Sequence, residues 1–165
     1  LTTVNGGITL SDNVKADELT TVNGGVTVGD FCEIDGITVV NGDIEAGQQL
    51  VSGDSIESVN GDIILGFGAK VDGSMITVNG DIEAADLTLT DNIETVNGDI
   101  RISGNSVIDG DIIYDDPENN DNPSTPTLSI ADTVRLNGEI ILERDVKLEI
   151  PDTMTSKVRY KSSAM

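Results

Sequence analysis

The sequence lacks histidine altogether, and it holds one cysteine and four aromatic residues in 165 positions. Without histidine there can be no histidine-based catalytic triad, proton relay or metal site. The single cysteine, Cys32, allows neither an internal disulfide nor a cysteine-rich zinc site. Because aromatic residues make up 2% of the chain, the core has to be built from Ile, Val and Leu, which favours strands over a helical bundle.

Basic residues are also scarce. Nine Lys and Arg stand against 30 Asp and Glu, which gives a formal net charge of -21. Binding to nucleic-acid phosphates requires clustered Lys and Arg, and an anionic membrane surface repels a chain of this charge. No apolar run approaches the roughly 18 residues that a membrane-spanning helix needs. We therefore expect neither nucleic acid as a partner nor direct insertion into a membrane.

A repeat dominates what is present. The tripeptide Val-Asn-Gly occurs six times at spacings of 18 or 19 residues. Each period holds three short runs with alternating apolar residues, separated by three turns, and it is too short to contain a helix. It predicts an all-β fold, a single-stranded parallel β-helix (β-solenoid) with roughly triangular coils. We expect about seven coils stacked about 4.8 Å apart, wound right-handed as crossover connections generally are.

One stretch interrupts the repeat. Residues 115–127 are polar and contain three prolines, which cannot join a strand ladder. The repeat resumes at Ile130 and ends near Ile150. The sequence thus predicts a solenoid over residues 1–150 with a protruding loop at 115–127, followed by a polar, basic C-terminal tail or cap over 151–165.

Stacked coils place equivalent residues above one another in columns. The asparagine of each tripeptide can both donate and accept, so a column of amides satisfies itself as a hydrogen-bonded ladder. We expect this structural ladder at Asn5, Asn23, Asn41, Asn60, Asn79 and Asn97. The side chain of the valine before each asparagine could point into the core or outward. We favour the core, because corners disturb strict alternation. If these side chains point outward, the column from Val4 to Val96 forms an exposed stripe suited to a lateral partner.

A second column holds the candidate metal ligands Asp43, Asp62, Asp81 and Asp99, two residues after each asparagine. Carboxylates about 5 Å apart repel by roughly 1 kcal/mol even in water, so solvent or a cation must offset the repulsion. One interpretation is a solvated acidic edge. The other is a calcium site, since Ca²⁺ prefers oxygen ligands. We predict no catalytic residue, no cofactor-binding residue and no required cofactor.

The two ends of the predicted rod differ. The repeat is already under way at Thr2, without a cap-like segment, so we expect either a missing cap or another chain over that end. Three of the nine basic residues lie before residue 135, and the segment after Asp152 carries Lys157, Arg159 and Lys161 without an acid. This pattern favours a basic end that docks on an acidic body or on the next copy. A head-to-tail contact of this kind tends toward filaments.

The repeats Val-Asn-Gly-Gly-Ile/Val-Thr and Val-Asn-Gly-Asp-Ile, over residues 1–114 and 128–150, resemble those of bacterial β-solenoid proteins. The nearest groups are the bactofilins, which are polymer-forming cytoskeletal proteins, and envelope proteins of the adhesin type. The resemblance implies a right-handed solenoid with a structural role and self-association end to end.

We therefore expect a non-enzymatic structural or scaffold protein of the bacterial envelope or a secreted one, with the cytoplasm as the alternative location. The alternative function is a cell-surface adhesin or cation-binding module that uses the aspartate columns and loop 115–127. A pair of carboxylates is the catalytic arrangement of glycoside hydrolases. Acidic residues are so frequent in this sequence that such pairs do not indicate an enzyme.

Overall fold

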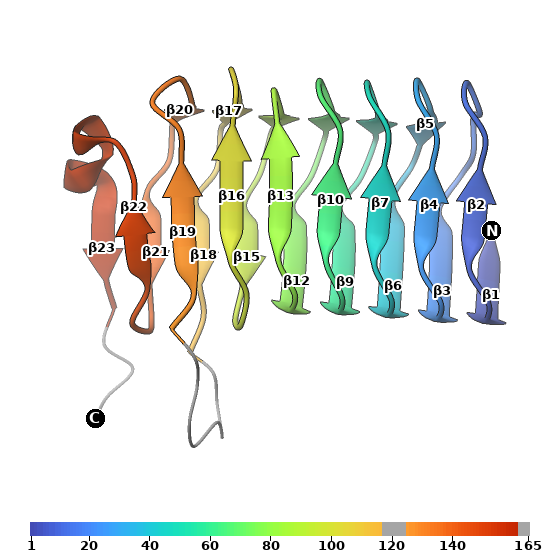
Figure 1. Cartoon of the computed structure of the whole chain (residues 1–165), viewed down its shortest axis with the longest axis horizontal. Coiled ribbons are helices and arrows are strands. Elements are labelled where there is room, and N and C mark those ends of the chain that lie inside the picture. The colour runs from blue at the N-terminus through green and yellow to red at the C-terminus, as the bar shows by residue number, and fades with distance from the viewer. Residues whose placement is uncertain (117–124, 162–165) are drawn as a thin grey trace.

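A computed structural model describes residues 1–116 and 125–161 of the chain. It is an all-β parallel solenoid of about eight turns with three parallel sheets. Figure 1 shows the coils side by side as a rod, with the N-terminus at one end and the C-terminus at the other. The predicted fold class is thus confirmed, with one turn more than the sequence suggested.

Successive turns place their strands in three parallel sheets, here named A, B and C. Sheet A consists, in spatial order, of β1 (Thr2–Asn5), β3 (Leu19–Asn23), β6 (Ile37–Asn41), β9 (Ile56–Asn60), β12 (Met75–Asn79), β15 (Ile93–Thr95), β18 (Ile112–Tyr114), β21 (Ile140–Leu142) and β23 (Val158–Tyr160). Sheet B consists of β2 (Ile8–Leu10), β4 (Val26–Val28), β7 (Ile44–Ala46), β10 (Ile63–Leu65), β13 (Ile82–Ala85), β16 (Ile100–Ser103), β19 (Thr127–Ile130) and β22 (Lys147–Glu149).

Sheet C is shorter. It consists of β5 (Glu33–Ile34), β8 (Val51–Ser52), β11 (Lys70–Val71), β14 (Thr88–Leu89), β17 (Val107–Ile108) and β20 (Arg135–Leu136). The pairing keeps equivalent repeat positions opposite one another, as with Asn23 beside Asn41 and Asn41 beside Asn60. Because one residue of slip would turn every side chain to the other face, this register is fixed by the buried apolar positions.

The core is a set of apolar columns that run along the rod. In β3, Leu19 and Thr21 are buried, whereas Thr20 and Val22, which alternate with them along the strand, are only partly covered. The same alternation in sheet B buries Ile44, Ile63 and Ile82 in successive coils. Each strand has one face on the core and one in solvent, and the buried face stabilises the fold. The gain in free energy is about 25 cal/mol per Å² of apolar surface removed from water.

The valine column corrects the favoured sequence interpretation. Val4 is 58% exposed and Val59 41% exposed, and the valines of the coils between them are half-buried. The inward position of each strand is the residue before the valine, for example Thr21, because alternation holds up to the corner. The valines therefore line the outer face of sheet A, which was the second of the two directions considered.

The chain re-enters the solenoid through Thr127, the first residue of β19. Most of the loop predicted at 115–127 lies in residues 117–124, outside the described residues. The hydroxyl of Tyr114, a fully buried side chain, donates to the carbonyl of Thr127 across the core at 3.2 Å. Burial and the nearby Asp99 carboxylate raise the pKa of Tyr114, so this hydroxyl remains a donor. The contact joins the two sides of the insertion.

The segment predicted as a tail or cap forms the 3-10 helix η1 (Asp152–Lys157) and then β23, which pairs with β21. Met154 of η1 is 4% exposed and belongs to the core. The strand accounts for the additional turn. In order along the chain, η1 takes the place between sheets B and A where earlier coils have a strand of sheet C.

Candidate functional site

The six predicted ladder asparagines lie in one column at the corner between sheets A and B. The Nδ2 group of each donates to the Oδ1 atom of the one before it, at 2.9–3.0 Å. All six are exposed or half-buried, so the ladder runs along the outside of the corner. The glycine after each asparagine lets the next coil approach closely: a Cβ at Gly80 would overlap the carbonyl oxygen of Gly61.

Arg144 closes the described ladder at its C-terminal side. Its Nη1 group donates to Oδ1 of Asn97 at 2.6 Å and to the carbonyl of Val96 at 2.7 Å. The register of β15, β18 and β21 places Arg144 in the continuation of the asparagine column. The guanidinium thus supplies the donors that an amide of the next coil would supply. Sequence reasoning did not find this residue, because its role depends on how the chain returns after the insertion.

The four candidate calcium ligands also form a column, and their carboxylates accept backbone hydrogen bonds. The N–H groups of Asp62, Asp81 and Asp99 each donate to Oδ1 of the preceding aspartate at 2.8–2.9 Å. The N–H of Thr127 donates in the same way to Asp99, at 2.8 Å. Each carboxylate therefore bonds to the backbone of the coil that follows it and helps to hold that coil in place.

Nowhere in the described residues do three or more His, Cys, Asp or Glu side chains gather in a group that could hold a metal ion. The aspartate column is spread along the rod rather than closed around a point. Calcium binding by Asp43, Asp62, Asp81 and Asp99 stays a prediction from sequence, and the geometry assigns these carboxylates to backbone bonds.

The same carboxylate-to-backbone bond recurs at the other corners, where the sequence analysis did not expect it. Oδ1 of Asp12 accepts from the N–H of Asp30, at 2.8 Å, and Asp30 accepts in turn from Gln48, at 2.9 Å. Asp86 and Asp111 make equivalent bonds to the coils that follow them. The signal available in the sequence was the recurrence of Asp at many of the turns.

Buried hydroxyls form a further set that the sequence did not reveal. Thr21, Ser58 and Thr77 occupy the same inward column of sheet A, and their hydroxyls donate to glycine carbonyls of the preceding coil at 3.0–3.2 Å. These bonds satisfy polar groups inside an apolar core, which lets hydroxyl residues stand at core positions.

Two acidic groups on the outer face of sheet A are perturbed. Partial burial and the neighbouring carboxylates of Asp115, Asp91 and Glu57 raise the pKa of Glu94. Partial burial and Glu143 also raise the pKa of Asp115, an effect that Lys161 partly offsets. Both groups lie close to acidic residues of neighbouring coils, so repulsion and partial burial destabilise their charged forms.

An acidic groove follows the corner between sheets C and A over the first coils. It consists of two adjoining hollows of about 520 and 340 Å³ that share Asp17 and Asp35 in their walls. Glu18, Asp54 and Glu57 extend the acidic lining. The groove gives the N-terminal part of the rod a strongly negative flank.

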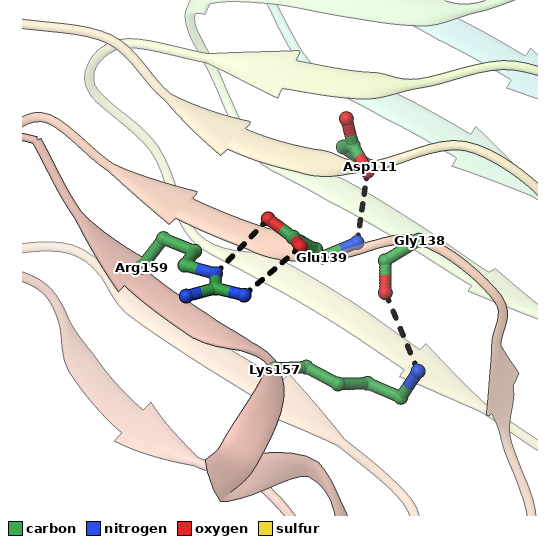
Figure 2. A network of polar contacts seen from close by, with 5 residues as sticks. All are labelled: Asp111, Gly138, Glu139, Lys157 and Arg159. Carbon is green, nitrogen blue, oxygen red and sulfur yellow. Dashed lines mark hydrogen bonds and ion pairs between the residues drawn. The ribbon is translucent and has the colours of Figure 1, made fainter.

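The C-terminal end instead holds basic residues in the segment after Asp152. Figure 2 shows how it is fastened: Arg159 donates to both carboxylate oxygens of Glu139, at 3.2 and 3.4 Å, and Lys157 to the carbonyl of Gly138, at 3.5 Å. The N–H of Glu139 donates in turn to Oδ1 of Asp111 at 2.8 Å. These contacts hold η1 and β23 against the preceding coil.

Tyr160 is the notable residue of this end. It lies in the inward column of sheet A, directly beside Leu142, which itself lies beside Tyr114. Leu142 and Tyr114 are 1% and 0% exposed, whereas Tyr160 is 71% exposed. A core position thus remains open to solvent at the terminal strand of the sheet.

No helix in the described part of the chain is long and apolar enough to cross a membrane. Comparisons with protein-family models, with curated proteins and with solved structures found no match to this chain. What the geometry itself shows is a β-solenoid of stacked parallel strands.

Proposed function

We propose that this protein is a non-enzymatic structural rod that assembles head to tail, the C-terminal end of one copy meeting the N-terminal end of the next. The observation that carries the proposal is Tyr160, an aromatic side chain in a core column that is 71% exposed at the last strand of sheet A. Another coil stacked on β23 would bury it, as the coil of β21 buries Tyr114.

The edge strands support the same arrangement. β1 and β23 are the first and last strands of sheet A, and they lie at opposite ends of the rod with the same strand direction (Figure 1). An edge strand presents unpaired N–H and C=O groups that template further pairing. If β1 of a second copy pairs with β23, sheet A continues parallel through the junction. Such a contact is heterologous, so it propagates into filaments.

Charge favours this polarity over contacts between like ends. Asp17, Glu18 and Asp35 line the groove near the N-terminal end, whereas Lys157, Arg159 and Lys161 stand at the C-terminal end. Head-to-tail contact brings unlike charges together, and contacts between two identical ends do not. The attraction between the ends is screened as the salt concentration rises.

The resemblance of the repeats to bactofilins agrees with a polymer-forming role, and we propose the bacterial envelope or the extracellular space as its place of action, with the cytoplasm as the alternative. The second function inferred from sequence, a cell-surface adhesin or cation-binding module, would use carboxylates that already accept backbone bonds. A melting temperature that rises with calcium would favour that function instead.

The test compares two exposed aromatic residues. Tyr160→Ser removes the ring at the proposed junction, and Phe67→Ser removes a ring that is 59% exposed on the side of the rod, between sheets B and C. We expect the wild type and the Phe67 variant to form filaments at about 10 µM in light scattering and electron microscopy, and the Tyr160 variant to stay monomeric. Equal behaviour of the two variants, or monomers in all three, would overturn the proposal.

A further inference from the structure

The fold imposes a chemically reactive dipeptide at the corner between sheets A and B. The hydrogen-bonded ladder requires asparagine there, and the close approach of successive coils requires glycine after it. Asn-Gly is the dipeptide most prone to lose side-chain ammonia, because glycine has no Cβ to hinder attack by its backbone nitrogen on the amide carbon of the asparagine. The ladder therefore lasts only where these backbone nitrogens are kept from the amides.

In the first four coils the next coil holds the glycine N–H groups at this corner. Each group donates to the carbonyl of the asparagine one coil further on, at 2.9–3.1 Å. These N–H groups belong to Gly6, Gly24, Gly42 and Gly61. In the fifth coil, Asn79 still forms a β-bridge with Asn97 in the same register. Attack on an amide requires the nitrogen to leave its acceptor, so pairing with the next coil protects the asparagines.

Asn97 is the last asparagine of the ladder, and it lacks this protection. Thr95 pairs with Tyr114, so Asp116 stands in the next coil where another asparagine would continue the column. Among the described residues, no group accepts a hydrogen bond from the N–H of Gly98. The backbone nitrogen that can attack the amide of Asn97 is therefore not held by the coil that follows it.

Arg144 acts on the same amide. Its Nη1 group donates to Oδ1 of Asn97 at 2.6 Å, whereas the corresponding oxygen of Asn60 accepts from the neutral amide of Asn79. When a nitrogen attacks the amide carbon, negative charge develops on the amide oxygen, and a guanidinium already bonded to that oxygen stabilises the charge. At Asn97 an unheld nucleophile and a polarised amide thus occur together.

We propose that Asn97–Gly98 is a site of self-modification, at which Arg144 promotes closure of a succinimide ring. The backbone nitrogen of Gly98 gives its proton to water and bonds to Cγ of Asn97. The bond between Cγ and Nδ2 breaks, and Nδ2 takes a proton from water and leaves as ammonia. A water molecule then opens the ring at either of its carbonyl carbons, which leaves aspartate or isoaspartate at position 97.

The product suits the end of the ladder better than its interior. A carboxylate at position 97 still accepts from Arg144, and the hydrogen bond becomes one between opposite charges. The bond from Asn97 to Asn79 is lost, because a carboxylate cannot donate. At Asn60 the same change would set a carboxylate against the amide oxygen of Asn41, and it would accept only from a neutral amide. The fold therefore tolerates the modification best at position 97.

The chain contains its own controls. Asn41 and Asn60 are followed by glycines whose N–H groups are held by the next coil. Asn137 is the comparison for the arginine: within the described ranges the N–H of Gly138 also has no acceptor, but the amide of Asn137 donates to Asp109 at 2.7 Å and no arginine bonds to its oxygen.

The wild-type protein is incubated at mildly alkaline pH in water enriched in oxygen-18, so that ring opening during the incubation labels the product. It is then digested in acid, and tandem mass spectrometry locates aspartate and isoaspartate. A parallel incubation in urea that unfolds the chain should give similar rates at all Asn-Gly sites, because the protection by neighbouring coils is then gone.

In the folded protein we expect labelled product at position 97 to form about tenfold faster than at Asn41 and Asn60, and faster than at Asn137. Arg144→Met should slow the reaction at position 97 about tenfold, whereas Arg144→Lys, which keeps a cation, should slow it less. Melting curves check that both variants are folded. Equal rates at Asn97 and Asn41 would overturn the site. An Arg144→Met protein that reacts as fast as wild type would overturn the role of the arginine. Neither result bears on filament formation.

Discussion

Asparagine and aspartate occupy neighbouring columns at the same corner, and their side chains form different hydrogen bonds. Asn60 donates to Asn41 and accepts from Asn79, so its amide needs both of its functions. Asp62, two residues later, only accepts, from the N–H of Asp81. A carboxylate cannot donate, so the first column requires amides while the second suits aspartate.

Asn60→Asp should therefore break the bond to Asn41 and keep the bond from Asn79. We expect a loss of about 1 kcal/mol at pH 7, or about 2–4 °C in melting temperature. The charged carboxylate faces an oxygen of Asn41, so the loss is present above the pKa of the new group and disappears below about pH 3. Asn5→Asp is the control, since Asn5 only accepts in the ladder. Equal losses in the two variants would contradict the ladder.

The charged form of Glu94 lowers the stability of the folded protein. Its pKa is raised in the folded protein by burial and by Asp115, Asp91 and Glu57. The folded state therefore holds this proton more tightly than the unfolded state, and wild-type stability falls as pH rises through the raised pKa. Glu94→Gln should melt about 1–2 °C higher than wild type near pH 7.5, with no gain near pH 3.5. Glu45→Gln on sheet B controls for net charge, and an equal gain there would show that the local environment of Glu94 is irrelevant.

Only part of this residue-level chemistry is readable from sequence. The asparagine column could be predicted because one residue type recurs at one spacing and amides are self-complementary. The direction of Val59 could not, because alternation at a corner depends on which residue begins the turn. The backbone bonds of Asp43 could not either, since a recurring carboxylate is equally consistent with a solvated edge or a cation.

At the scale of the coil, close approach at the corners decides which glycines are required. At Gly80 a Cβ would overlap the carbonyl oxygen of Gly61, whereas at Gly53 the nearest atom would lie 3.7 Å away, in ordinary contact. Gly80→Ala should cost about 3 kcal/mol and Gly53→Ala less than about 0.5 kcal/mol. Urea unfolding measures both. Similar costs for the two alanines would argue against this stacking distance.

Arg144 is partly buried, whereas Arg159 is exposed, so the two arginines should contribute differently to stability. Arg144 donates to Asn97 and Val96 at the end of the ladder, whereas Arg159 forms an ion pair with Glu139 whose side chains are 63% and 46% exposed. Arg144→Met should cost about 2 kcal/mol, and Arg159→Met less than about 1 kcal/mol. The free energy of unfolding in low salt is the measurement, and a larger cost at Arg159 would reverse this assignment.

The sheets and their order could be predicted from the period of the repeat, because a coil of 18 or 19 residues accommodates only three short strands. The last turn could not. Residues 152–160 carry no Val-Asn-Gly tripeptide and read as a polar tail, yet Met154 packs into the core and Val158 pairs with Ile140. Their place is set by the open end of the stack, which no local pattern encodes.

At the scale of the whole molecule, the rod has two different ends and a long side. The proposed end contact depends on Tyr160 and on unlike charges at the two ends. Because salt screens these charges, end-to-end assembly should weaken as the salt concentration rises.

Electron cryo-microscopy of the wild-type protein at low salt tests the central claim most directly. If copies stack head to tail, filaments one solenoid wide should show an uninterrupted layer spacing of about 4.8 Å through each junction. Single rods at every concentration, or chains in which like ends meet, would contradict it.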